Sequence, residues 1–122
     1  MVDLPRDLIE KCKERLLRDK EDILNRVKSA RRNLYNDDRG GDEADQTQRV
    51  LAERDLINET ERLRQQLAEI EFALARIASG TYGICEETEE PIEAERLLAI
   101  PWTRLSIEGA EIRESMRKRY AR

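Results

Sequence analysis

The residues of this chain best suited to metal chemistry surround a single cysteine, Cys85. A knuckle that binds zinc through four cysteines would place them at positions 85, 88, 106 and 109, where this chain has Cys85, Thr88, Ser106 and Gly109. Structural zinc needs four thiolate or imidazole ligands in a tetrahedral arrangement, and one thiolate cannot supply them. The sequence therefore predicts a degenerate zinc knuckle that binds no metal.

The chain has two cysteines, Cys12 and Cys85, and no histidine, so metal clusters and Cys–His nucleophile pairs lack their usual components. We predict no enzymatic activity. Cys12 is expected to be a small apolar side chain on a helix, with a Cys12–Cys85 disulfide as the alternative. Cys85 is either a redox- or metal-sensing thiol or a buried remnant of the lost site. Glu86 and Glu87 favour the remnant, because nearby negative charge should raise the pKa of the thiol.

Composition limits the class of protein to which the chain can belong. Its 122 residues are 41% charged and 4% aromatic, which suits long two-faced helices better than a thick spherical core. The net charge of −4 argues against general affinity for nucleic acid. The sequence contains no apolar run of about 18 residues, so no membrane span is predicted. The N-terminus lacks the basic-then-apolar layout of a signal peptide. We therefore expect the protein in the interior of a bacterium or organelle, with the cytoplasm as the location.

Two long helices, predicted over residues 5–35 and 45–79, must position these residues. In the second helix one apolar stripe repeats every seven positions at Leu56, Leu63, Ile70 and Ile77. The adjoining stripe holds Thr60, Leu67 and Leu74. In the first helix the repeat is Ile9, Leu16, Ile23 and Ala30. Such heptads predict a coiled-coil seam, and the short connection between the helices predicts an antiparallel hairpin that is complete as a monomer.

The connection between the helices, residues 36–48, is acidic. It contains five carboxylates against the single cation Arg39. Asp42 or Asp45 could cap the second helix, which accounts for one of these acids but not for all five. The sequence therefore predicts a hairpin, residues 1–79, with an acidic tip.

Residues 80–122 are predicted to form a small globular region with an irregular segment and a final helix at about 105–120. Its expected core residues are Tyr82, Ile84, Ile92, Leu97, Leu98 and Trp102. They should pack on the base of the hairpin near Leu8, Ile9 and Cys12. The basic end of the last helix is either a favourable charge at a helix C-terminus or a contact for an acidic partner surface.

Two motifs resemble the DksA/TraR family of bacterial transcription factors, over residues from about 42 to the C-terminus. Residues 80–85 read Gly-Thr-Tyr-Gly-Ile-Cys and are followed at 96–101 by Arg-Leu-Leu-Ala-Ile-Pro. Residues 42–47, Asp-Glu-Ala-Asp-Gln-Thr, resemble the family's fingertip signature Asp-x-x-Asp-x-Ala. The resemblance implies a mainly α-helical protein with a long antiparallel coiled-coil hairpin and a small zinc-finger-like end.

The resemblance also implies a function, since members of this family bind RNA polymerase without binding DNA. The globular end would hold the rim of the polymerase secondary channel while the hairpin enters it and modulates initiation. Asp42 and Asp45 would be the working acids near the catalytic magnesium, with Thr47 where the family has alanine. Arg62 and Arg96 are further candidates for polymerase contacts, and for both the alternative is a solvated or intramolecular arginine.

Two departures from the family pattern limit what the resemblance carries over. Zinc does not carry over, and packing and hydrogen bonds must hold the loop, as in zinc-free members of the family. Ile100 stands where many relatives have an arginine. The phosphates of guanosine tetraphosphate, the signal of the stringent response, need Arg or Lys, so a response of this protein to that nucleotide is not expected from the resemblance. The alternative function is a structural coiled-coil adaptor that binds another helical protein.

Overall fold

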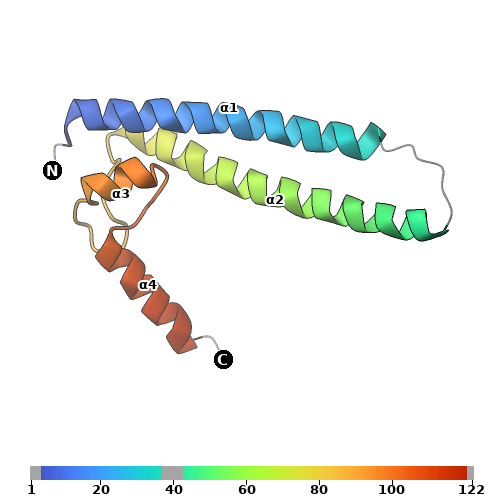
Figure 1. Ribbon diagram of the computed structural model, residues 1–122. Coiled ribbons are helices and arrows are strands. Elements are labelled where there is room, and N and C mark those ends of the chain that lie inside the picture. The colour runs from blue at the N-terminus through green and yellow to red at the C-terminus, as the bar shows by residue number, and fades with distance from the viewer. Residues whose placement is uncertain (1–3, 37–42, 121–122) are drawn as a thin grey trace. The chain divides into compact units, whose positions relative to one another are not determined.

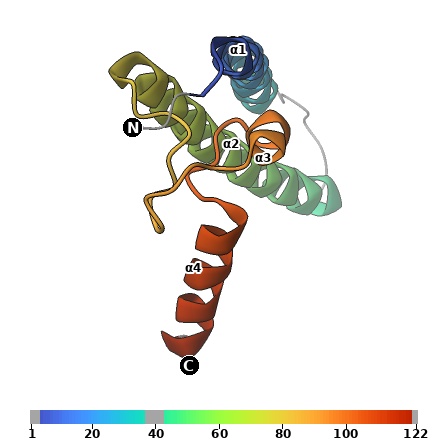
Figure 2. The ribbon, with the colours of Figure 1, turned by 90° about the vertical axis from the view of Figure 1, so that its left-hand side faces the viewer.

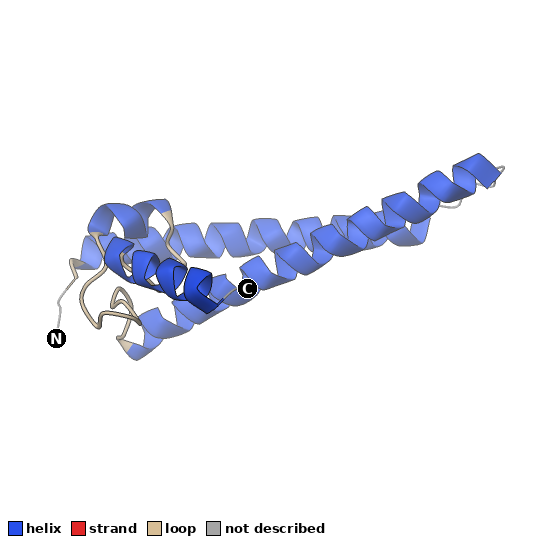
Figure 3. Ribbon diagram, turned by 90° about the horizontal axis from the view of Figure 1, so that it is seen from below, coloured by secondary structure: helices blue, strands red, loops and turns tan. Residues whose placement is uncertain are grey.

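The computed structural model describes residues 4–36 and 43–120. They form four helices, α1 (Arg6–Asn36), α2 (Glu43–Ser79), α3 (Ala94–Ala99) and α4 (Ile107–Tyr120) (Figure 1). The mainly α-helical fold class is confirmed, and the part of the chain described contains no strand, only an isolated bridge between Ile84 and Pro91 (Figure 3). The short helix α3 was not predicted. None of the described helices is long and apolar enough to span a membrane.

The ends of the two long helices follow from local hydrogen bonding. At the start of α1 the Pro5 carbonyl accepts bonds from the N–H groups of Leu8 and Ile9, at 3.1 and 3.2 Å. At the end of α2, Gly80 has a φ of 80°, a conformation that glycine adopts without steric cost. The reversal lets the Thr81 N–H donate to the Arg76 carbonyl at 2.9 Å. The predicted end of the second helix is therefore confirmed.

The chain divides into two compact units. The base unit comprises residues 1–18 and 69–122, and the arm unit comprises residues 19–68. Within the arm unit the two helices bury Ile23, Ala30 and Leu63, each less than 9% exposed, which confirms the predicted seam at these positions. Within the base unit, segments on both sides of position 79 share one core.

The core of the base unit is built from α1, the end of α2, α3 and the loop around Cys85 (Figure 2). Its most deeply buried residues are Leu16, Ile92, Leu97, Pro101, Cys12 and Cys85. The Tyr82 hydroxyl is also buried and donates to the Pro101 carbonyl at 2.8 Å. The Cys12 Sγ lies 3.6 Å from the Leu97 carbonyl oxygen. Both cysteines are free and buried, so Cys12 fills the core as predicted and the disulfide alternative is wrong.

The predicted core of the globular region is correct in part. Tyr82, Ile92 and Leu97 are buried, whereas Ile84 and Trp102 are half-buried. The prediction that Leu98 belongs to the core is wrong, because 43% of this residue is exposed. Consecutive residues of a helix point about 100° apart, so when Leu97 of α3 faces the core its neighbour cannot.

We predict different costs for truncating these two adjacent leucines. Leu97→Ala removes a side chain with no exposed surface and should lower the free energy of unfolding by about 2–5 kcal/mol. The matched change Leu98→Ala should cost less, about 1 kcal/mol, since Leu98 is already 43% exposed. Urea denaturation followed by circular dichroism measures both. Equal losses would contradict the assignment of the core.

Candidate functional site

The four positions of the degenerate knuckle come together at the start of α4. Ser106 directly precedes this helix and is 6% exposed. Its Oγ accepts a hydrogen bond from the Gly109 N–H at 3.0 Å, as the N-cap of a helix does. Ser106 and Thr88 act on Cys85 electrostatically, because their hydroxyl and backbone N–H groups favour its ionised form. A position that holds a ligand in a four-cysteine knuckle thus holds a helix cap in this chain.

The knuckle does not fit zinc. Gly109 offers no ligand, and a Cβ atom at this position would collide with the Sγ of Cys85. The same Cβ would lie 3.3 Å from the Ser106 Oγ. Across residues 4–36 and 43–120, no group of three or more His, Cys, Asp or Glu side chains is arranged to hold a metal ion. The first turn of α4 approaches the Cys85 loop so closely that position 109 has no room for a side chain that could serve as a ligand.

The electrostatic setting of Cys85 differs from the sequence-based expectation. Burial of the sulfur opposes its ionisation, but hydrogen bonds from the hydroxyl and backbone N–H groups of Ser106 and Thr88 outweigh it. They lower the pKa of Cys85 from its usual 9.0 to about 6. The prediction that Glu86 and Glu87 raise this pKa is wrong, since both carboxylates pair with Arg113. A pKa of about 6 favours the thiolate form of Cys85 at neutral pH.

Arginine–carboxylate pairs connect the knuckle to the helices around it. The Arg113 guanidinium of α4 donates to Glu87 at 3.0 Å and to Glu86 at 3.3 Å. Arg104 donates two bonds of 3.1 Å to the Glu69 carboxylate of α2. Its guanidinium also stacks 3.7 Å from the centre of the Phe72 ring. Bidentate and stacked geometries of this kind are specific to arginine.

Two further side chains bind the backbone of the base unit. Arg76 of α2 donates to the carbonyls of Thr81 and Ile84, at 2.9 and 2.5 Å. The Glu93 carboxylate accepts from the Ile107 N–H at 3.1 Å and satisfies a free donor at the start of α4. None of these links was predicted, because the partners are many residues apart or are backbone groups.

The predicted tip residues are only partly covered by the structure. Asp42 lies outside the described residues. Asp45 lies in the first turn of α2, although its side chain is not among those described, and Thr47, two residues further on, is exposed. Acids at this end of a helix are favoured by the helix dipole. Their role at the polymerase stays a prediction.

Both candidate contact arginines have partners within the chain. Arg62 forms an ion pair with Glu59 on the same helix. The Arg96 Nε donates to the Leu105 carbonyl at 2.8 Å. These bonds correspond to the intramolecular alternative, and a further contact with a polymerase stays a prediction for each.

The geometry defines a class of protein, a helical hairpin that carries a zinc-finger-type knuckle without its metal ligands. Residues 80–118 match the family described as prokaryotic dksA/traR C4-type zinc finger. The RNA polymerase-binding transcription factor DksA of Caulobacter vibrioides is 36% identical over 109 residues, covering 87% of this chain and 75% of that protein. General stress protein 16O of Bacillus subtilis is 44% identical over 46 residues, 38% of this chain and 28% of that protein.

A solved structure agrees with the sequence relatives. Transcription factor DksA2 from Pseudomonas aeruginosa superposes with a TM-score of 0.82 and 34% identity, over 94% of this chain and 88% of that one. The chain belongs to the DksA/TraR family. Within the family pattern its knuckle is distinguished by Thr88, Ser106 and Gly109 at three of the four ligand positions.

We predict that Gly109→Ala destabilises the base unit. Alanine is the better helix former by up to about 1 kcal/mol, yet its Cβ meets the Cys85 sulfur, so we expect a net loss of about 1–3 kcal/mol. Cys85→Ala removes the obstructing atom. In a double-mutant cycle measured by thermal or urea denaturation, the cost of Gly109→Ala should shrink in the Cys85→Ala background. Strict additivity would contradict the close approach.

We also predict a pH dependence of stability that arises from Cys85. Its folded pKa of about 6 lies below the unfolded value, so its contribution is fully present above about pH 9. The contribution is lost as the pH falls through 6. Between these limits the free energy of unfolding should rise by up to ~1.4 kcal/mol per pH unit more steeply in the wild type than in Cys85→Ala. Parallel pH profiles of the two proteins would show that the thiolate is absent.

Proposed function

We propose that this protein binds RNA polymerase and regulates transcription initiation without catalysing a reaction and without binding DNA specifically. The observation that carries the proposal is the match in fold and sequence to DksA proteins over most of both chains. The Caulobacter relative is named as an RNA polymerase-binding transcription factor. The net charge of −4 agrees with a protein partner rather than a nucleic acid.

The base unit is the part that would hold the rim of the polymerase secondary channel. Arg104 and Arg113 bond the knuckle to α2 and α4 by paired carboxylate contacts, which fix the loop without a metal. A fixed loop presents the same surface to its partner in each encounter and loses little conformational entropy on binding. The monomer is the form proposed to act on the polymerase.

The arm unit is the part that would enter the channel. Its two helices bury a narrow seam at Ile23, Ala30 and Leu63, while most other described side chains of the unit face solvent. Asp42 and Asp45 at the connection would then approach the catalytic magnesium, a hard cation that prefers oxygen ligands. Carboxylates there alter the charge around the active site and thereby the stability of the open complex. Thr47 adds a hydroxyl at the third position of the signature.

A response to guanosine tetraphosphate is not part of the proposal. Ile100, which follows α3, is half-buried and its N–H donates to the Arg96 carbonyl. An isoleucine offers no charge to a phosphate, whereas phosphate binding needs Arg or Lys.

One observation favours the alternative of a coiled-coil adaptor. Val50 and Ile57, seven residues apart on the same side of α2, are 59% and 58% exposed. Apolar residues with this spacing could pair with a helix of another protein. Under the adaptor hypothesis, substitutions in the arm helices should impair function more than substitutions in the acidic connection between them.

We predict that the double variant Asp42→Asn, Asp45→Asn loses its effect on transcription while its affinity for RNA polymerase is retained. The reason is that the amides keep the shape of the side chains but remove two charges near the metal. A pull-down with core polymerase and in vitro transcription measure the two properties.

The matched control is Asp37→Asn, Asp38→Asn, which removes the same charge from the same connection and should leave the transcriptional effect in place. If the Asp42 and Asp45 variant regulates like the wild type, the proposed mechanism is wrong. Loss of function in Val50→Lys, Ile57→Lys together with an active Asp42 and Asp45 variant would establish the adaptor instead.

A further inference from the structure

Most of α4 has no packing partner within its own unit. From Glu111 to Tyr120 every residue is exposed, including Ile112 at 36%, Met116 at 48% and Tyr120 at 77%. Within α4 only the first two turns are anchored, through Ser106 and Gly109 at its start and through the bonds of Arg113 to Glu86 and Glu87, and a helix of 14 residues is marginally stable in water on its own. Covering the apolar side chains of such a helix with a second surface removes them from water and lowers the free energy.

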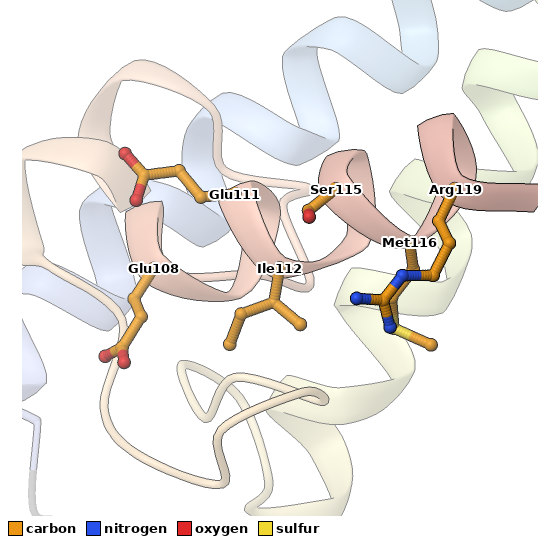
Figure 4. Close-up of a pocket in the computed structure, with 6 residues that line it drawn as sticks. All are labelled: Glu108, Glu111, Ile112, Ser115, Met116 and Arg119. Carbon is orange, nitrogen blue, oxygen red and sulfur yellow. The ribbon is translucent and has the colours of Figure 1, made fainter.

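The exposed residues on one side of α4 form an ordered surface. A shallow hollow on this side is lined by Glu108, Glu111, Ile112, Ser115, Met116 and Arg119 (Figure 4), and we call it the α4 face. The acids lie toward the N-terminal end of the face and the cation lies at the C-terminal end. Between them lie two apolar side chains and one small one, Ser115, which permits close approach of another backbone.

We propose that the α4 face docks onto the α4 face of a second copy of this chain, with the two helices antiparallel. Two-fold symmetry about the middle of the face opposes Glu108 to Arg119, Ile112 to Ser115 and Glu111 to Met116. The same six residues thus complete both sides of the contact, as an interface between identical chains requires. The arrangement places a large side chain against a small one at the centre.

Charge selects this antiparallel partner over a parallel one. The antiparallel pair forms the Glu108–Arg119 contact twice, whereas parallel helices would set Glu108 against Glu108 and Arg119 against Arg119. Neither residue has an ion pair within the part of the chain described, so both charges are available to a partner. Arg117, by contrast, lies on the opposite side of the helix and pairs with Glu114.

The size of the face sets the strength of the association. Fourteen residues of helix are about 21 Å long, and one pair of such helices buries less surface than a standard stable interface. The dimer should therefore be reversible, appear as the protein concentration rises, and weaken with added salt, because its ion pairs are at the surface.

Sedimentation equilibrium of the full chain at increasing concentration tests the proposal through a charge exchange. Arg119→Glu gives a face with acids at both ends and Glu108→Arg gives one with cations at both ends. Each variant alone should be monomeric where the wild type dimerises. An equimolar mixture of the two variants should recover the dimer, because every end then meets its opposite charge.

The matched control is Arg117→Glu, which makes the same charge change in the same helix on the side away from the face and should leave dimerisation intact. Circular dichroism shows whether each variant remains folded, and recovery in the mixture excludes misfolding as the cause. A wild type that stays monomeric to millimolar concentration, variants that dimerise like the wild type, or a mixture that stays monomeric would each overturn the proposal.

Discussion

The close approach of the first turn of α4 to the Cys85 sulfur is the constraint on which the base unit depends. Gly109 permits it because any side chain would collide with the sulfur. Ser106 both caps α4 and favours the ionised form of Cys85, so one residue acts on the end of the helix and on the loop. Placing a residue with a side chain at position 109 would separate α4 from the loop.

This knuckle is stabilised by distributed contacts instead of one strong centre. Zinc would hold four ligands at a point, whereas Arg104 and Arg113 reach outward to carboxylates on α2 and the loop. Each such pair is partly exposed and contributes modestly, so their joint geometry matters more than any single bond. The stacking of Arg104 on Phe72 adds a contact that a lysine could not make.

The sequence predicted the features that recur along the chain and missed those that occur once. The heptad repeats that include Ile23 and Leu63, together with the glycine at position 80, predicted the bounds of α1 and α2 to within a few residues. The helix α3 has six residues, too few to show a period. The pair Arg104–Glu69 joins positions 35 apart, and the lowered pKa of Cys85 depends on donors brought by folding. At the connection the sequence offers Asp42 and Asp45, whose role stays a prediction.

The base unit is discontinuous in sequence, and this has a consequence for how the protein is made. Cys12 packs against the backbone of Leu97, 85 positions later, so the core cannot close until both long helices and the knuckle have left the ribosome. The arm helices involve nearer neighbours and can pair sooner. During synthesis the apolar positions of α1, such as Leu16, therefore remain uncovered and accessible to chaperones.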